Sequence, residues 1–265
     1  MEKHHKSLLY TRASKSVNDL FFISNSRQIG PYRFKGYRAA LKFLIKSYVK
    51  KPSLILDAGC GDGWLLLDAN TQGIGLDVNR ENIRKANKAK KKRMINNLHF
   101  IVADICHIPL LEHEIFDVIV CCDALEHVKE SELAISELSS YLKKKGKFLI
   151  TTSNSLNPIM LLDRMLPTKI SNTILLTLGE KYYPRTRRYN PYNLQQTVNR
   201  YKLRVCKLFM FASPPFAFLF SRRAKTLIPI LIVGRAMFYI WIAFDKMTNH
   251  FLKYLKECIL VIATK

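Results

Sequence analysis

A short segment that follows an apolar run has the residue types and the spacing needed to hold a nucleoside-bearing ligand. Residues 54–56 lead into Asp57, and Gly59, Gly61 and Gly63 follow at alternate positions. Glycine has no Cβ atom and tolerates left-handed dihedral angles, so a tight turn built from it brings the backbone close to a ligand. A dinucleotide-binding loop has the spacing G-x-G-x-x-G and accommodates a pyrophosphate. Here the third glycine comes one residue early, and Asp57 and Asp62 add negative charge to the loop. The loop therefore favours a cationic ligand.

A second acid follows at the interval that a βαβ unit requires. Residues 73–77 have the pattern of a second strand, and this strand ends at Asp77, twenty residues after Asp57. An acid at the end of the second strand of such a unit accepts hydrogen bonds from the hydroxyls of a ribose. Asp77 is therefore the expected ribose acceptor.

Two further segments continue the series. Residues 100–105 read as a third strand that carries Asp104 and Ile105, and residues 116–128 contain a fourth strand followed by Asp123 and His127. Over residues 50–152 the four segments resemble, in order and spacing, the motifs of the class I S-adenosylmethionine-dependent methyltransferases. The resemblance implies an α/β, Rossmann-like, doubly wound sheet of seven strands with an antiparallel last strand. It also implies S-adenosyl-L-methionine as the cofactor.

The resemblance implies a role for each motif residue. Asp57 faces the ammonium end of the methionine, and Asp77 binds the ribose. Asp104 and Ile105 read the adenine, and Val78, next to Asp77, contacts an adenine face. The rest of the expected cofactor-binding set is Gly59, Cys60, Gly61, Gly63 and Cys121.

The acceptor side of the site is expected after the fourth strand. A histidine titrates near pH 6.5, which suits the removal of a proton from a phenol or a sugar hydroxyl, so His127 is the candidate base, with Asp123 beside it. The alternative is that His127 only organises the start of a helix. The stretch 123–127 also resembles the acid-x-x-Glu-His pattern of methyltransferases that use a divalent ion. Because the only later histidine is His250, a full ligand set is not visible, and we expect no metal.

The remaining elements are expected from local signals. Residues 79–93 form a helix with a basic stripe. A second helix, residues 131–142, has Ser131 as its N-cap and the lysines 143–145 at its C-terminal end, and Gly146 stops it. Residues 147–152 and 204–208 are strands five and six, and residues 190–194 open a further helix between them. Arg188 and Tyr189 resemble the stretch that closes over the acceptor in related small-molecule enzymes.

The length predicts one domain, residues 1–265. The resemblance implies that residues 1–50 form its N-terminal lid and that residues 258–263 form the last strand, inserted between strands five and six. Residues 209–256 are therefore an apolar helical insertion in the final hairpin. Residues 1–10 lack the apolar core of a secretory signal, so the domain is expected in the cytoplasm.

Charge and apolar patterning together suggest the partners. The formal net charge is +23, from 43 basic and 20 acidic side chains, which favours an anionic surface, either phospholipid or nucleic acid. Residues 209–244 are strongly apolar but interrupted by prolines and by Arg235, which disfavours a membrane span. We therefore expect peripheral association with an anionic membrane and a small, hydrophobic or lipid-linked acceptor methylated on oxygen. The alternatives are a roof over the substrate pocket or a dimer interface for this segment, an RNA or protein methyltransferase, and a cofactor-binding protein without catalysis.

Overall fold

The computed structural model describes residues 53–69, 71–156, 188–211 and 258–265. The chain divides into two compact units. The described elements belong to the unit formed by Leu44–Ser155, Tyr183–Leu208 and Cys258–Lys265, except that residues 209–211, the end of the sixth strand, are grouped with the other unit. The predicted single domain and lid, and nearly all of the predicted insertion, concern residues outside the described ranges and stay predictions.

The first described elements, up to the third strand, alternate between strand and helix. In order, they are β1 (Leu54–Ala58), α4 (Trp64–Ala69), β2 (Gln72–Asp77), α5 (Arg80–Lys92), β3 (Leu98–Val102), β4 (Phe116–Cys122), the short 3-10 helix η1 (Leu125–His127), α6 (Ser131–Tyr141), β5 (Leu142–Ser153), α9 (Pro191–Arg200), β6 (Arg204–Phe211) and β7 (Cys258–Thr264).

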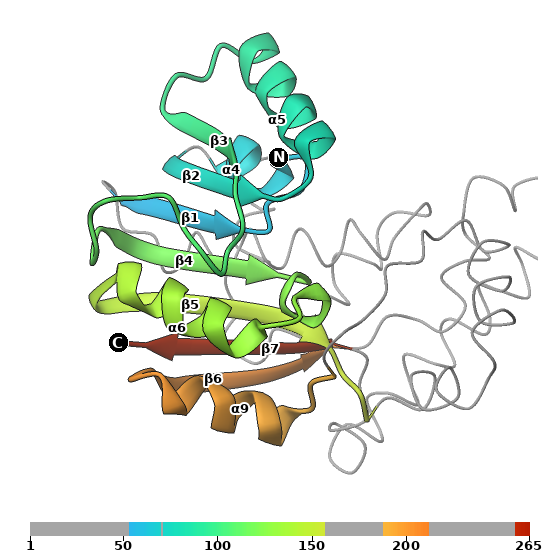
Figure 1. Cartoon of the computed structure of the whole chain (residues 1–265), viewed down its shortest axis with the longest axis vertical. Coiled ribbons are helices and arrows are strands. Elements are labelled where there is room, and N and C mark those ends of the chain that lie inside the picture. The colour runs from blue at the N-terminus through green and yellow to red at the C-terminus, as the bar shows by residue number, and fades with distance from the viewer. Residues whose placement is uncertain (1–52, 70, 157–187, 212–257) are drawn as a thin grey trace, which may run out of the picture. The chain divides into compact units, whose positions relative to one another are not determined.

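The strands form one seven-stranded sheet in the order β3-β2-β1-β4-β5-β7-β6. The first five strands of this order pair in parallel, and β7 runs antiparallel to β5. In Figure 1 the arrowheads of β1, β4 and β5 therefore point the same way, and that of β7 points the opposite way. The predicted α/β, Rossmann-like sheet with an antiparallel last strand between strands five and six is confirmed.

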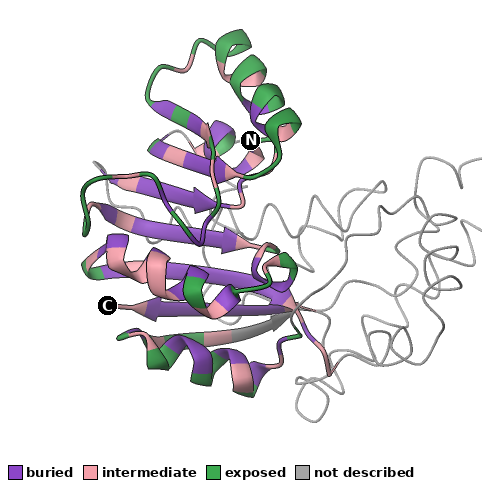
Figure 2. Cartoon of the chain, viewed as in Figure 1, coloured by how far each residue is buried: buried purple, intermediate pink, exposed green. Residues whose placement is uncertain are grey.

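The core lies along the central strands, which are apolar on both faces as parallel strands covered by helices require. Figure 2 shows β1, β4, β7 and the second half of β5 as nearly continuous buried segments, while exposed residues gather along the outer sides of α5 and α9. The fully buried aromatic side chains of this core include Phe116 and Phe148, which lie on β4 and β5. This packing fixes the strand ends from which the site is built.

The start of β5 differs from the sequence prediction. The run Lys143–Lys145 is not the basic end of the preceding helix, because the helix ends at Tyr141 and the chain enters β5 at once. Leu142 pairs with Phe116 of β4, and the Lys143 Nζ atom lies 2.9 Å from Asp117 Oδ1. Pairing with β4 therefore outweighs the local helix signal, and Gly146 lies within a strand rather than after a helix.

The predicted N-cap of α6 is also wrong. The cap position is Glu130, whose side chain makes no capping hydrogen bond, and Ser131 is the first helical residue. The buried Ser131 hydroxyl instead accepts a hydrogen bond from the Tyr189 hydroxyl at 2.6 Å. Tyr189 is itself buried, so its ring belongs to the core, and Arg188 beside it is exposed.

Candidate functional site

The predicted site residues meet at one edge of the sheet. Asp57 lies on β1 and pairs across to Gly75 of β2 and Val120 of β4. Because these three strands are parallel, their carboxyl ends open on the same side, to the right in Figure 1. The loop after β1, the turn after β2 and the turn after β4 therefore lie side by side.

Backbone hydrogen bonds hold the glycine loop over the end of β2. The nitrogens of Gly59 and Cys60 both donate to the carbonyl oxygen of Leu76, at 2.8 and 2.9 Å. The nitrogen of Gly61 then donates to Asp77 Oδ2 at 2.8 Å. The loop is thus fixed in place by the strand that carries the expected ribose acceptor.

The three glycines of the loop are needed for different reasons. All three have positive φ, at +77°, +55° and +75° for Gly59, Gly61 and Gly63. A Cβ atom on Gly59 would lie 2.5 Å from the Cβ atom of Ala124, and one on Gly63 would lie 2.7 Å from the Phe100 ring. A Cβ atom on Gly61 would meet nothing within 4 Å. Packing therefore requires glycine at the two outer positions, and Gly61 alone faces open space that a ligand could fill.

Asp57 is a buried acid with an unused acceptor. Its side chain is 2% exposed, and its Oδ2 atom has no hydrogen-bond partner. Burial, followed by the nearby charge of Asp77, raises the pKa of the Asp57 carboxyl from 3.8 to about 7. A buried carboxylate of this kind is stabilised by a cation, so the site fits the ammonium group of S-adenosylmethionine.

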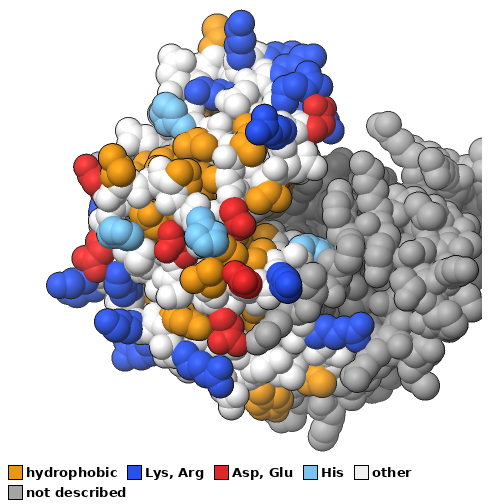
Figure 3. All heavy atoms as spheres, in the orientation of Figure 1, with side chains coloured by type: hydrophobic (Ala, Val, Ile, Leu, Met, Phe, Trp, Pro, Cys, Tyr) orange, Lys and Arg blue, Asp and Glu red, His pale blue; other side chains and the backbone are white. Residues whose placement is uncertain are grey.

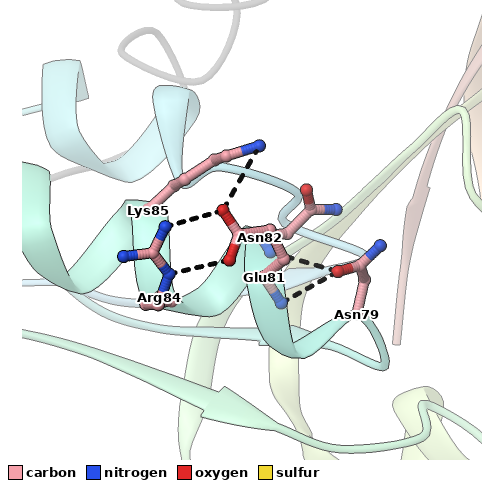
Figure 4. A network of polar contacts seen from close by, with 5 residues as sticks. All are labelled: Asn79, Glu81, Asn82, Arg84 and Lys85. Atoms are coloured by element: carbon pink, nitrogen blue, oxygen red, sulfur yellow. Dashed lines mark hydrogen bonds and ion pairs between the residues drawn. The ribbon is translucent and has the colours of Figure 1, made fainter.

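Asp77 joins the loop to the first turn of α5. Its Oδ1 atom accepts a hydrogen bond from the Asn79 nitrogen at 2.8 Å, and the Asn79 side chain caps the helix through the nitrogens of Glu81 and Asn82 (Figure 4). Each carboxylate oxygen can accept more than one hydrogen bond, so Asp77 keeps acceptor capacity for ribose hydroxyls. The ribose role stays a prediction, now with a fixed geometry around the acid.

The expected adenine contacts lie on two neighbouring turns. Val78, directly after Asp77, is 68% exposed, so its side chain is accessible to a ligand that contacts Asp77. The third strand ends at Val102, so Asp104 and Ile105 lie in the following turn rather than on the strand. The Ala103 nitrogen donates to the Asp77 carbonyl oxygen at 3.1 Å, which places this turn beside the ribose acceptor.

The two cysteines of the predicted set are buried. Cys121 is fully buried on β4, and Cys60 is 2% exposed in the loop. Burial raises the pKa of both thiols well above the ordinary range, so both are protonated at neutral pH. All six cysteines of the chain lie in described segments and are free, as expected for reduced thiols.

The acceptor-side residues follow β4, as the sequence predicts. Asp123 and His127 are both exposed, and they bracket the short turn that includes η1. Ala124 in this turn is the residue that leaves no room for a side chain at Gly59, so the turn directly contacts the cofactor loop. The candidate base therefore lies on the segment that adjoins the cofactor side of the site.

Sequence reasoning missed how Glu126 is used. This acid is 3% exposed, and its carboxylate accepts hydrogen bonds from Thr152 and Ser153 at the end of β5. The sequence signal for these hydrogen bonds is the run of three hydroxyl residues at 151–153, after an apolar strand. In the described part of the chain, no three His, Cys, Asp or Glu side chains are grouped closely enough to hold a metal ion.

A basic surface follows α5, seen as a blue cluster in Figure 3. Part of it is neutralised, since Glu81 lies 2.7 Å from Arg84 and 3.7 Å from Lys85 (Figure 4), and Asp68 lies 2.7 Å from Arg93. The other basic side chains of the helix have no acidic partner within the described ranges: Arg80, Lys88, Lys90, Lys91 and Lys92.

Comparison with known proteins was consistent with this geometry. The family model for the methyltransferase domain matches residues 50–187, more than half of the chain. N-methyltransferase 4 from Papaver somniferum is 28% identical over 109 residues, which cover 39% of this chain and 31% of that protein. A ubiquinone biosynthesis O-methyltransferase from Rickettsia canadensis is 28% identical over 113 residues, covering 41% of this chain and 46% of the relative. The chain thus spans less than half the length of these curated relatives.

The fold is also found in solved structures. Geranyl diphosphate C-methyltransferase from Streptomyces coelicolor, crystallised with Mg²⁺, geranyl diphosphate and S-adenosyl-L-homocysteine, superposes with a TM-score of 0.55 at 15% identity. The match covers 86% of this chain and 80% of that one. At this identity the likeness concerns the fold alone. With the family match, the open position at Gly61 and the unpartnered oxygen of Asp57, the chain belongs to the methyltransferase domain family and has S-adenosylmethionine as its cofactor.

Proposed function

We propose that the chain transfers the methyl group of S-adenosylmethionine to an oxygen atom of a small, hydrophobic or lipid-linked acceptor. The observation that carries this proposal is the contact between the cofactor loop and the acceptor-side turn, in which Ala124 adjoins Gly59. Asp123 and His127, which precede and follow Ala124 in this turn, are both exposed. A proton acceptor at that place suits a hydroxyl acceptor, whose proton must leave as the new bond forms.

The residues of this chain have a limited task in such a reaction. The bound cofactor supplies a methyl group on a sulfonium, which is already activated for in-line displacement. Asp57 and Asp77 hold the two ends of the cofactor's polar part, and Gly61 allows the backbone to approach it. Orientation of the two reactants then provides most of the rate, and His127 takes the acceptor's proton.

The choice of oxygen and of an apolar acceptor has separate support. The O-methyltransferases of ubiquinone biosynthesis favour oxygen, while the N-methyltransferase from Papaver somniferum shows that relatives of similar identity differ in the atom methylated. The apolar acceptor rests on the sequence of residues 209–244, which lie almost entirely outside the described residues. Among the helices that are described, none is long and apolar enough to span a membrane.

The second candidate is methylation of RNA or protein. It is favoured by the unneutralised basic side chains on the outer face of α5 (Figure 3). A basic helix face attracts any polyanion, and it is also an ordinary solvated surface. An Asn-Pro-Pro-Tyr type of tetrapeptide after the fourth strand would favour this function. Residues 122–125 do not have that sequence, so we place this function second.

Isotope transfer distinguishes the candidates. The protein is incubated with S-adenosylmethionine labelled in its methyl group, together with lipid extract, total RNA or total protein from cells that contain it. We expect label in the organic phase of the lipid reaction, in a product that resists mild acid as an aryl or alkyl ether does. Label confined to RNA or protein would overturn the proposal, and the Asp77→Ala variant provides the background.

A further inference from the structure

The carboxylate of Glu126 is buried under the turn that carries His127. Its Oε2 atom accepts a hydrogen bond from the Thr152 hydroxyl at 2.9 Å. Its Oε1 atom accepts from the Ser153 nitrogen at 3.2 Å and from the Ser153 hydroxyl at 3.3 Å. The next residue, His127, is exposed. One side chain therefore links the acceptor-side turn to the last two residues of β5.

The turn is short, and two backbone hydrogen bonds close it. The helix η1 is only three residues long and has no side-chain cap, and its backbone bonds are His127 N to Ala124 O at 3.0 Å and Val128 N to Leu125 O at 3.2 Å. A 3-10 turn of this length is stabilised by its surroundings rather than by its own hydrogen bonds. The contacts to β5 therefore contribute to where His127 lies.

The start of the same turn is also attached to β5. The Asp123 nitrogen donates to the Thr151 carbonyl oxygen at 2.9 Å, and the Thr151 hydroxyl donates to Asp123 Oδ1 at 3.2 Å. Asp123 has φ of 51°, in the left-handed region that Asp and Asn adopt more readily than other residues with side chains. Hydrogen bonds from residues 151–153 thus attach both ends of the turn to β5.

We propose that Glu126 is a positioning residue for methyl transfer. Its hydrogen bonds to Thr152 and Ser153 fix the turn so that the imidazole of His127 is presented to the acceptor. This inference rests on the proposed function, in which His127 is the base. It differs from a metal-ligand role for the Glu-His pair, because a ligand role requires the carboxylate charge, whereas positioning requires only the hydrogen bonds to β5.

A change of Glu126 to glutamine separates geometry from charge. The amide oxygen of Glu126→Gln still accepts from Ser153, and its amide nitrogen donates to the Thr152 hydroxyl, which rotates to accept. The substitution therefore keeps the links to β5 and removes the negative charge. Glu126→Ala removes both. A metal ligand or a proton acceptor needs the charge, whereas a positioning residue needs only the hydrogen bonds.

The first measurement is amide hydrogen exchange of the peptide that covers residues 123–130, in the full chain. We expect exchange at His127 and Val128 to rise roughly tenfold or more in Glu126→Ala, and to stay at the parent rate in Glu126→Gln. Glu130→Ala, which removes an exposed acid from the same segment, is the matched control and should match the parent. Parent-like exchange in Glu126→Ala would overturn the proposal.

The second measurement is label transfer from S-adenosylmethionine into the lipid extract. We expect kcat to fall at least about tenfold in Glu126→Ala and to remain within about threefold of the parent in Glu126→Gln, with cofactor Kd unchanged in both. A Glu126→Gln variant as slow as Glu126→Ala would show that the charge is needed and would contradict positioning.

A third variant covers the case in which Glu126→Ala does not fold. Thr152→Val keeps the shape of the side chain and removes one of the three donors, so it should shift exchange and kcat in the same direction by a smaller factor; parent-like values for both would contradict positioning. If the parent protein transfers label to none of the lipid, RNA and protein fractions, the proposed function fails. The exchange rates still decide whether Glu126 holds the turn.

Discussion

The Asp77 Oδ2 atom accepts a hydrogen bond from the Gly61 nitrogen at 2.8 Å. This bond joins the cofactor loop after β1 to the acid at the end of β2. It fixes the one glycine of the loop whose missing side chain leaves open space. The same acid is therefore placed to shape the loop and to bind the ribose.

Substitution of single loop glycines should separate binding from stability. Gly61→Ala places a methyl group in open space at φ +55°, so we expect a loss of roughly 1–2 kcal/mol in the free energy of unfolding. Cofactor affinity should fall more than tenfold, because the methyl group occupies the place of the ligand. Calorimetric titration with S-adenosylmethionine and urea denaturation measure the two effects.

The matched control is Gly63→Ala. Its new methyl group would lie 2.7 Å from the Phe100 ring and 3.0 Å from the Ala86 Cβ atom, inside the protein. We expect it to reduce the free energy of unfolding more than Gly61→Ala does, by roughly 1–3 kcal/mol from overpacking added to the backbone strain. The interpretation of the loop is wrong if Gly61→Ala binds the cofactor as the parent does.

Cofactor affinity should depend on pH through Asp57. The pKa of this carboxyl is about 7 in the free protein, so below that pH the cofactor's ammonium group must displace a proton. Affinity should then rise with pH by up to about tenfold per unit between pH 5 and 7 and level off above pH 7. Calorimetry in buffers of different ionisation enthalpy should record proton release on cofactor binding to the parent at pH 6, and none for Asp57→Asn. The affinity of Asp57→Asn for the cofactor should be lower and should not depend on pH.

The same carboxyl should lower the stability of the free protein at neutral pH. Its folded-state pKa is raised from 3.8 to about 7, so its contribution to stability is fully present below about pH 4 and is lost as the pH rises to about 7. Between pH 5 and pH 8 the free energy of unfolding of Asp57→Asn should therefore gain roughly 3 kcal/mol relative to the parent. If the free energy of unfolding of the two proteins changes in parallel with pH, ionisation of Asp57 does not destabilise the folded state.

His127 should affect transfer and leave cofactor binding unchanged. In His127→Ala we expect turnover with the lipid-phase acceptor to fall by up to about a hundredfold, as for the loss of a general base, while the Kd for S-adenosylmethionine stays at the parent value. Label transfer and calorimetry measure these quantities. Full activity of the variant would assign proton removal to another group, and metal stimulation that Asp123→Ala abolishes would support an ion-dependent site instead.

Membrane association can be tested by flotation with anionic vesicles. We expect the intact protein to float with vesicles that contain phosphatidylserine, and to be released by salt because each basic residue near the headgroups adds roughly 1 kcal/mol. A variant with residues 209–244 replaced by a short polar loop should stay in the dense fraction. An intact protein that ignores vesicles would remove the main support for a lipid-linked acceptor.

The sequence was sufficient for the sheet because the strand signals are strong and local. The apolar runs at β1 and β4 lead into acids or glycines, and α9 begins at Pro191 after its N-cap Asn190, where the sequence predicts a helix start. The antiparallel place of β7 was predicted from the resemblance rather than from any local signal, and the pairing confirms it.

Contacts distant in the chain decided what the sequence could not predict. The lysines at 143–145 look like a helix end until β4 is available for Leu142 to pair with. Ser131 looks like an N-cap, but Tyr189, 58 positions away, donates to its hydroxyl. The burial of Glu126 depends in the same way on the end of β5. Local patterns predict the elements, whereas side-chain partners are chosen by packing.

The central claim, that the loop after β1 and the acid after β2 bind S-adenosylmethionine, is tested most directly by calorimetric titration of the parent and Asp77→Ala. Removal of paired hydrogen bonds to a charged acceptor should weaken binding by about 1–3 kcal/mol for each bond, so a micromolar Kd in the parent should rise at least tenfold. Asp62→Ala removes an exposed acid from the same loop and should bind as the parent does. Equal affinity in Asp77→Ala and the parent, or effective competition by NADH, would contradict the account.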